Sequence, residues 1–164
     1  LLAASARGHV ATTKLLIDRG ADVNWRRDQD GINALLIACN GGHTEIVRLL
    51  IDRGGADINV ADAPDGRTPF FVACQKGHYD IVELLMHKGA ITDKVYDGVL
   101  PLEIAISKGH SAIAELLRPG IMEAMEVLIA AEGKVSALSA EHLAALAPVF
   151  ANFKQAKEAA PGKT

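Results

Sequence analysis

The sequence predicts an all-α protein, a solenoid in which short pairs of helices stack on one another. A Gly-His dipeptide recurs at residues 8–9, 42–43, 77–78 and 109–110, at intervals of 34, 35 and 32 residues. An apolar pattern of helical spacing follows each dipeptide, and a glycine ends the first three units. A repeat period of this length is typical of solenoids, in which each unit buries its apolar face against its neighbours.

The best-formed unit runs from Asp65 to Ala90. Its first residues, Asp65-Gly66, form a turn pair, and Thr68 followed by Pro69 predicts a helix N-terminus. Gly77 ends this first helix, and the second is expected from His78 to Lys88, with apolar residues at helical spacing (Ile81, Val82, Leu84 and Leu85). Gly89 is expected to stop it in the left-handed conformation.

The other units vary this pattern. Asn33 stands where Thr68 stands in the best-formed unit, and asparagine also caps helices well. Leu100 occupies the same position in the last unit and cannot accept the N–H bonds, an expected loss of about 0.5–2 kcal/mol. Gly54-Gly55 lengthens one helix stop by a residue, which glycine tolerates because it adopts left-handed conformations readily.

The segment Thr68-Pro69-Phe70-Phe71-Val72-Ala73 carries most of the T-P-L-H-x-A signature of a known repeat. With the four units in register, the chain resembles the ankyrin repeat family from Leu1 to about Arg118. The resemblance implies units at about 1–27, 28–62, 63–94 and 95–118. Apolar helical patterns then predict capping helices over 119–158, which would cover the open face of the last unit, and a flexible tail over 159–164. A separate partner-binding helix pair is the alternative for 119–158.

Composition excludes several classes of protein. The chain has 164 residues, a net charge of −3 and signs that are interspersed, so no charged block selects a partner. With a pI near 6.1, nucleic acid is not an expected partner despite Arg26 and Arg27. There is no long apolar run for a membrane span. We expect a monomer that is intracellular, cytoplasmic or nuclear, and we expect an N-terminal part before Leu1, because the first unit lacks its turn.

The two cysteines occupy the same position in consecutive units, after Ala38 and Ala73. Adjacent helices stack about 8–10 Å apart, whereas a disulfide needs Cα atoms within about 7 Å. We therefore expect Cys39 and Cys74 to be buried free thiols in a reducing compartment, with a redox pair as the alternative.

No pattern of residues predicts catalysis, a cofactor or a metal site. The Gly-His histidines recur once per unit and cannot converge on one ion, and the resemblance implies that they are structural. The aspartates at equivalent turn positions (Asp22, Asp30, Asp57 and Asp65) are expected to form Asx-type turns rather than a catalytic pair. The sequence has no phosphate-binding loop and no nucleophile elbow. The expected protein is not an enzyme.

The resemblance implies a non-catalytic interaction module that binds a protein or a peptide through a concave surface. In that family the turns project as fingers and the first helices form a palm. Carried over by register, the fingers are residues 25–32, 61–67 and 94–99. The candidate partner-binding residues are Trp25, Arg27, Gln29, Ile32, Asn40, Arg67, Gln75, Lys76, Tyr96, Val99 and Lys108.

Trp25 is the strongest candidate, because aromatic residues dominate the energetics of interfaces and this one falls in a turn. The alternative is that its ring lies over the backbone of the next unit. For the whole chain, the rival hypothesis is a regulatory or targeting segment of a larger enzyme. A weaker one is that Asn24 and Asn59 are modified by hydroxylation, as the resemblance implies for turn asparagines.

Overall fold

A computed structural model describes residues 1–62 and 66–118. The chain divides into two units, Leu1–Arg118 and Pro119–Thr164. The expected capping helices and tail, together with the Asp65 turn, lie outside the described residues. The structure therefore tests the repeats themselves.

The helices come in pairs, as the repeat predicts. They are α1 (Leu2–Ala6), α2 (Val10–Asp18), α3 (Ala34–Gly41), α4 (Thr44–Asp52), α5 (Pro69–Lys76), α6 (Tyr79–His87) and α7 (Pro101–Ser107). Residues 111–118 are also helical and complete the fourth pair. The described residues contain no strand, and an isolated bridge joins Tyr96 to Val99. The predicted all-α solenoid is confirmed.

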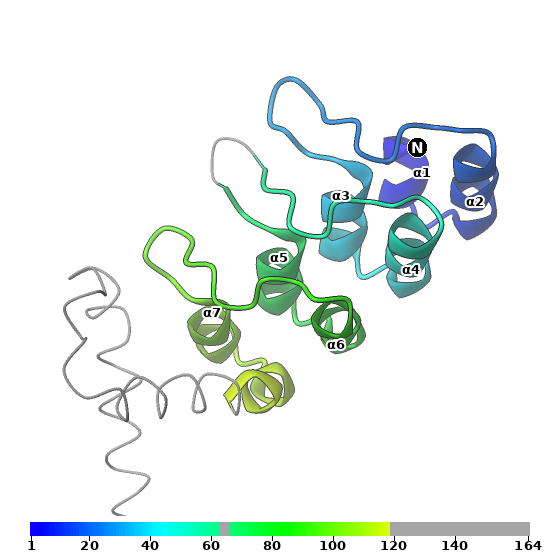
Figure 1. Cartoon of the computed structure of the whole chain (residues 1–164). Helices are drawn as coiled ribbons and strands as arrows, with labels where there is room; N and C mark the ends of the chain where they lie inside the picture. Colours follow the sequence, from blue (N-terminus) through cyan, green and yellow to red (C-terminus); the bar gives the residue numbers. More distant parts are fainter. Residues whose placement is uncertain (63–65, 119–164) are drawn as a thin grey trace, which may run out of the picture. The chain divides into compact units, whose positions relative to one another are not determined.

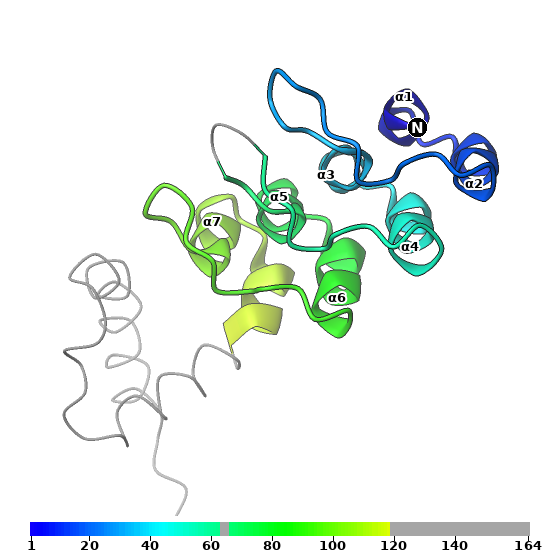
Figure 2. The same cartoon turned by 45° about the horizontal axis from the view of Figure 1, so that its top comes forward.

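The helices form two rows (Figures 1 and 2). In one row, here called the first-helix row, α1 packs on α3, α3 on α5 and α5 on α7; in the second-helix row, α2 packs on α4 and α4 on α6. The core lies between the rows, where the same position is buried in successive units. Ile46 and Ile81 are 35 residues apart and fully buried, as are Leu50 and Leu85. Burying one such side chain contributes about 1.5–3 kcal/mol.

The predicted caps are present. Thr68 Oγ1 accepts a hydrogen bond from Phe71 N at 3.2 Å, and Asn33 Oδ1 accepts one from Leu36 N at 2.9 Å. Leu100 supplies no side-chain acceptor to α7, as expected. A hydrogen bond that was not predicted compensates in part for this missing cap. The Glu103 carboxylate accepts it from Leu100 N at 2.8 Å.

The Gly-His histidines join each unit to the one before it. The imidazole Nε2 of His43 lies 3.3 Å from Ala6 O, that of His78 lies 3.3 Å from Asn40 O, and that of His110 lies 3.2 Å from Gln75 O. Each ring also lies against the glycine of the preceding Gly-His pair. The role of these three histidines is structural, as expected.

Two of the turn aspartates, Asp22 and Asp57, act as expected and start a second chain of contacts between units. Asp22 Oδ1 accepts from Asn24 N at 2.9 Å, and Asp57 Oδ1 accepts from Asn59 N at 3.0 Å. The two asparagines then accept backbone N–H groups of the following unit: Asn24 Oδ1 from Asp57 N at 2.9 Å, and Asn59 Oδ1 from Ile91 N at 2.8 Å. These bonds fix each turn relative to the next.

The extra residue at Gly54-Gly55 is accommodated in two different ways. Gly55 takes the left-handed conformation, with φ of 66°. Gly54 is needed for a different reason, because a Cβ atom there would lie 2.6 Å from Val23 Cγ1 and 2.7 Å from Leu50 O. The pair therefore combines a helix stop with a close contact to the unit before.

Candidate partner-binding surface

The loops between α2 and α3 and between α6 and α7 project to the same side of the repeats, and the described residues before 63 and after 65 in the loop between α4 and α5 run towards that side (Figure 1). These loops contain the predicted fingers. Arg27 N donates to Ile32 O and Asp62 N donates to Arg67 O, both at 3.0 Å, so four residues separate the paired positions. In the third loop Tyr96 and Val99 exchange two bonds across Asp97 and Gly98. Asp97 and Gly98 both have positive φ, as in the tight two-residue turns that join the strands of hairpins.

Arginines hold the shape of the first finger. Arg26 Nε donates to Gly31 O at 3.2 Å, and its guanidinium also donates to Ala61 O of the next unit. Arg27 forms a two-pronged ion pair with Asp30, whose carboxylate also accepts from Ile32 N. The hydrogen bonds from Arg27 lower the pKa of Asp30. Both guanidinium groups are therefore engaged within the protein, which weakens any case for phosphate binding here.

Trp25 lies at the base of this finger and is 52% exposed. A large apolar side chain that stays half in water gains burial energy only when something else covers it. Gln29, at the finger tip, is exposed as well. These two predicted residues are accessible to a partner.

The second and third fingers are joined by a packed cluster. Asp62, whose side chain is 5% exposed, pairs with the Arg67 guanidinium at 2.8 Å and accepts from Arg67 N at 2.6 Å. The guanidinium carbon of Arg67 lies 6.0 Å from the ring centre of Tyr96, and Tyr96 meets Phe71 edge-on with ring centres 4.8 Å apart. Arg67 and Tyr96 are half-buried. Their side chains are held in place by these contacts within the protein.

Two further predicted residues of the fingers face inward in part. Ile32 packs against a small buried cluster of Leu36, Val60 and Val72. Val99 is half-buried beside its hairpin partner Tyr96. A partner at the fingers would reach only the outer edges of both.

The predicted palm residues stand at the end of the first helices. Asn40, Lys76 and Lys108 are exposed and Gln75 is half-buried. The backbone carbonyls of Asn40 and Gln75 accept the histidine contacts described above, so the register of this row is fixed from unit to unit. The backbone at Asn40 and Gln75 is thus held in place, and this row presents polar side chains.

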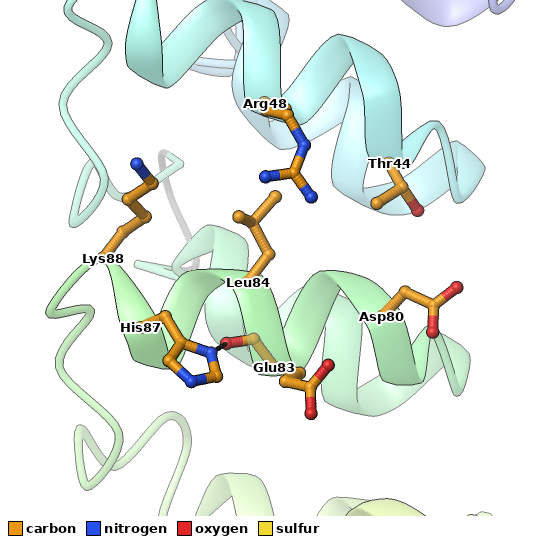
Figure 3. Close-up of a pocket in the computed structure, with 7 residues that line it drawn as sticks. All are labelled: Thr44, Arg48, Asp80, Glu83, Leu84, His87 and Lys88. Atoms are coloured by element: carbon orange, nitrogen blue, oxygen red, sulfur yellow. Dashed lines mark hydrogen bonds between the residues drawn. The ribbon is translucent and has the colours of Figure 1, made fainter.

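A groove on the other helix row was not anticipated from the sequence. It has a volume of about 420 Å³ and lies between α4 and α6 (Figure 3). Acidic, basic and uncharged residues line it: Thr44, Arg48, Asp80, Glu83, Leu84, His87 and Lys88. His87 Nδ1 contacts Glu83 O at 2.9 Å, and Lys88 pairs with Asp52 at 2.5 Å. Partial exposure of helix faces at a stacking interface explains such a groove, and no sequence motif marks it.

The described ranges offer little for chemistry. Across residues 1–62 and 66–118 no group of three His, Cys, Asp or Glu residues could hold a metal ion. Cys39 and Cys74 are free and buried, as expected, and burial raises the pKa of both thiols, that of Cys74 to about 12. Protonated thiols are poor nucleophiles. In the same part of the chain, no helix combines the length and apolarity needed to cross a membrane.

Comparison with known proteins agrees with this geometry. A family model described as "Ankyrin repeats (3 copies)" matches residues 1–95 and 55–125. The chain belongs to the ankyrin repeat family, whose members are protein-interaction modules and whose repeats are generally non-catalytic. Over 48 residues the chain is 46% identical to the "Probable E3 ubiquitin-protein ligase XBOS33" of Oryza sativa subsp. japonica. That match spans 29% of this chain and 9% of the ligase.

Proposed function

We propose that residues 1–118 bind a protein or peptide partner through the finger loops and the palm, without catalysing a reaction. The single observation that carries this proposal is the half-exposed Trp25 on a finger whose backbone is fixed by Arg26, Arg27 and Asp30. A rigid loop that presents an aromatic side chain loses little entropy on binding. Binding should need little backbone movement.

Capture of partners from the source cell tests this proposal when it is done with matched variants. A palm-and-finger variant combines Trp25→Ala with Gln75→Ala. A control variant combines Arg48→Gln with Glu83→Gln in the groove between α4 and α6 and leaves the net charge unchanged. The proposal expects a partner that wild type and control retain and the palm-and-finger variant loses. Loss in the control alone would move the binding site to the groove and contradict the proposal.

A second candidate function is a regulatory or targeting segment of a larger enzyme. The match to part of a probable ubiquitin ligase favours it. In that case the same surface would select what the enzyme acts on. The full-length reading frame decides this point, because it either joins a catalytic domain to the repeats or does not.

A further inference from the structure

One column of the palm carries positive charge. The residue directly before each Gly-His pair is Arg7, Gly41, Lys76 or Lys108 in the four successive units. The three basic side chains are exposed, and none of them has a hydrogen bond or an ion pair within the described part of the chain. Two other exposed cations, Arg53 and Lys88, pair with Asp18 and Asp52 of the preceding units.

Acidic residues do not compensate this column. Within α1, α3, α5 and α7 the one acidic residue is Glu103, which lies in the first turn of α7 and accepts from Leu100 N. Glu45 and Asp80 follow two residues after His43 and His78, but they belong to the first turns of α4 and α6, and Asp80 lines the groove of the second-helix row. An acid at a helix N-terminus interacts favourably with the helix dipole.

From this arrangement we propose that the palm binds an extended acidic peptide segment, with Arg7, Lys76 and Lys108 pairing with its carboxylates. The inference rests on the proposed function and specifies the chemistry of the partner. Charge complementarity carries it, because unpaired exposed cations attract a ligand of opposite sign and set its register. A nucleic acid is the less favoured ligand, since the chain has a net charge of −3 and the arginines of the first finger are engaged internally.

The repeat also predicts the spacing of the acidic residues. Neighbouring helices pack about 8–10 Å apart, and an extended chain rises about 3.3 Å per residue, so one unit corresponds to about three peptide residues. Lys76 and Lys108 belong to adjacent units, whereas Arg7 and Lys76 are two units apart. The intervening position is Gly41, where a Cβ atom would lie 2.7 Å from His43 Nε2. The matching peptide therefore has an acid, a second about six residues away and a third about three residues further, with no acid in the gap.

Titration of the full chain with fluorescent peptides tests this inference. One peptide carries three glutamates at the spacing just given, a second has the same composition with the glutamates adjacent, and a third has glutamine in their place. We expect the spaced peptide to bind at least about fivefold more tightly than the adjacent one, and to weaken as salt is raised. Equal binding of the spaced and adjacent peptides would overturn the spacing and with it the proposed register.

Matched variants of the protein complete the test. Arg7→Gln, Lys76→Gln and Lys108→Gln together should weaken the spaced peptide at least about tenfold. The control combines Lys14→Gln, Arg19→Gln and Arg48→Gln, which removes the same charge from exposed positions elsewhere and should retain binding. Equal losses in the two variants, or tighter binding of a single-stranded oligonucleotide than of the spaced peptide, would overturn the inference.

The natural partner separates this inference from the proposed function. If capture depends on Trp25 and Gln75 but not on the basic column, the acidic ligand is wrong and the proposed function stands. If capture depends on Arg48 and Glu83 alone, the proposed function itself is wrong.

Discussion

The imidazole ring of His78 lies directly against Gly42 of the preceding unit. A Cβ atom at Gly42 would come 2.7 Å from His78 Cε1, and the same ring has its Nε2 3.3 Å from Asn40 O. Gly42 also has φ of 75°, in the region that side-chain-bearing residues avoid. The glycine is therefore required twice, once for its backbone conformation and once for the space that the next histidine occupies.

Gly42→Ala should be more destabilising than a glycine substitution that changes conformation alone. The left-handed conformation costs an alanine about 1–2 kcal/mol, and overpacking against His78 adds about 1–3 kcal/mol. Gly89 is the matched control, because it has φ of 80° and a Cβ atom there would meet no described atom within 4 Å. Chemical denaturation of both variants should show the larger loss for Gly42→Ala, and equal losses would show that the contact with His78 adds nothing.

His78→Ala provides the second half of this measurement. Removing the ring opens the space, so Gly42→Ala should cost less in a His78→Ala background than in the wild type. The double-mutant cycle then isolates the contact between the two residues from the conformational cost. A coupling energy near zero would mean that the ring moves aside freely.

Asn33 offers a stabilising substitution. Its Oδ1 caps α3, but its Nδ2 is buried and has no hydrogen-bond partner among the described residues. Threonine, which caps α5 at the equivalent position, keeps an acceptor and replaces the two amide N–H donors by one hydroxyl that can rotate towards an acceptor. We expect Asn33→Thr to be neutral or to raise the free energy of unfolding by up to about 1 kcal/mol, and Asn33→Ala to lower it by about 1–2 kcal/mol. Thermal unfolding of the two variants checks this, and a large loss for threonine would contradict it.

Much of the fold could be predicted because its determinants are local. The Gly-His spacing, the caps at Thr68 and Asn33 and the apolar helical pattern each act within one unit, and each is present as predicted. Contacts between units could not be inferred in the same way. The sequence does not reveal that Gly54 makes room for Val23 of the preceding unit, because that contact depends on how two units approach in three dimensions.

The candidate surface was predicted less completely than the fold. Register placed the finger and palm positions, but it could not separate side chains that are held from those that are available. Arg67 and Tyr96 turn out to contact Asp62 and Phe71, whereas Trp25 stays half exposed. The groove between α4 and α6 has no sequence signature, since it arises from how two helices of neighbouring units pack.

The buried thiols predict a loss of stability in alkaline solution. An unfolded cysteine has a pKa of about 8.5, whereas burial raises the pKa of Cys39 and Cys74 and keeps them protonated to higher pH. The contribution of each buried thiol to the free energy of unfolding is therefore fully present below about pH 8.5. It falls as the pH rises towards the pKa of the folded state, by up to about 1.4 kcal/mol per pH unit for each thiol. Chemical denaturation at several pH values above about 8.5 gives the free energy of unfolding as a function of pH. This free energy should fall less steeply for the double variant Cys39→Ala, Cys74→Ala than for the wild type. A thiol reagent that labels the native wild type rapidly would contradict the burial.

Trp25→Ala should weaken partner binding without destabilising the repeats. An interfacial tryptophan contributes more than about 1 kcal/mol to binding, whereas a surface substitution changes stability by less than about 0.5 kcal/mol. Titration of the captured partner and a melting curve together check this prediction. Unchanged affinity with a lowered melting temperature would show instead that the ring packs on its own chain.

Site-specific photo-cross-linking tests the proposed binding surface most directly. A photoreactive residue replaces Gln75 on the palm in one protein and Glu83 in the groove between α4 and α6 in another, and each is irradiated with the captured partner. We predict a covalent adduct from position 75 and none from position 83. An adduct from position 83 alone would contradict the proposed surface, because the partner would then lie on the second-helix row.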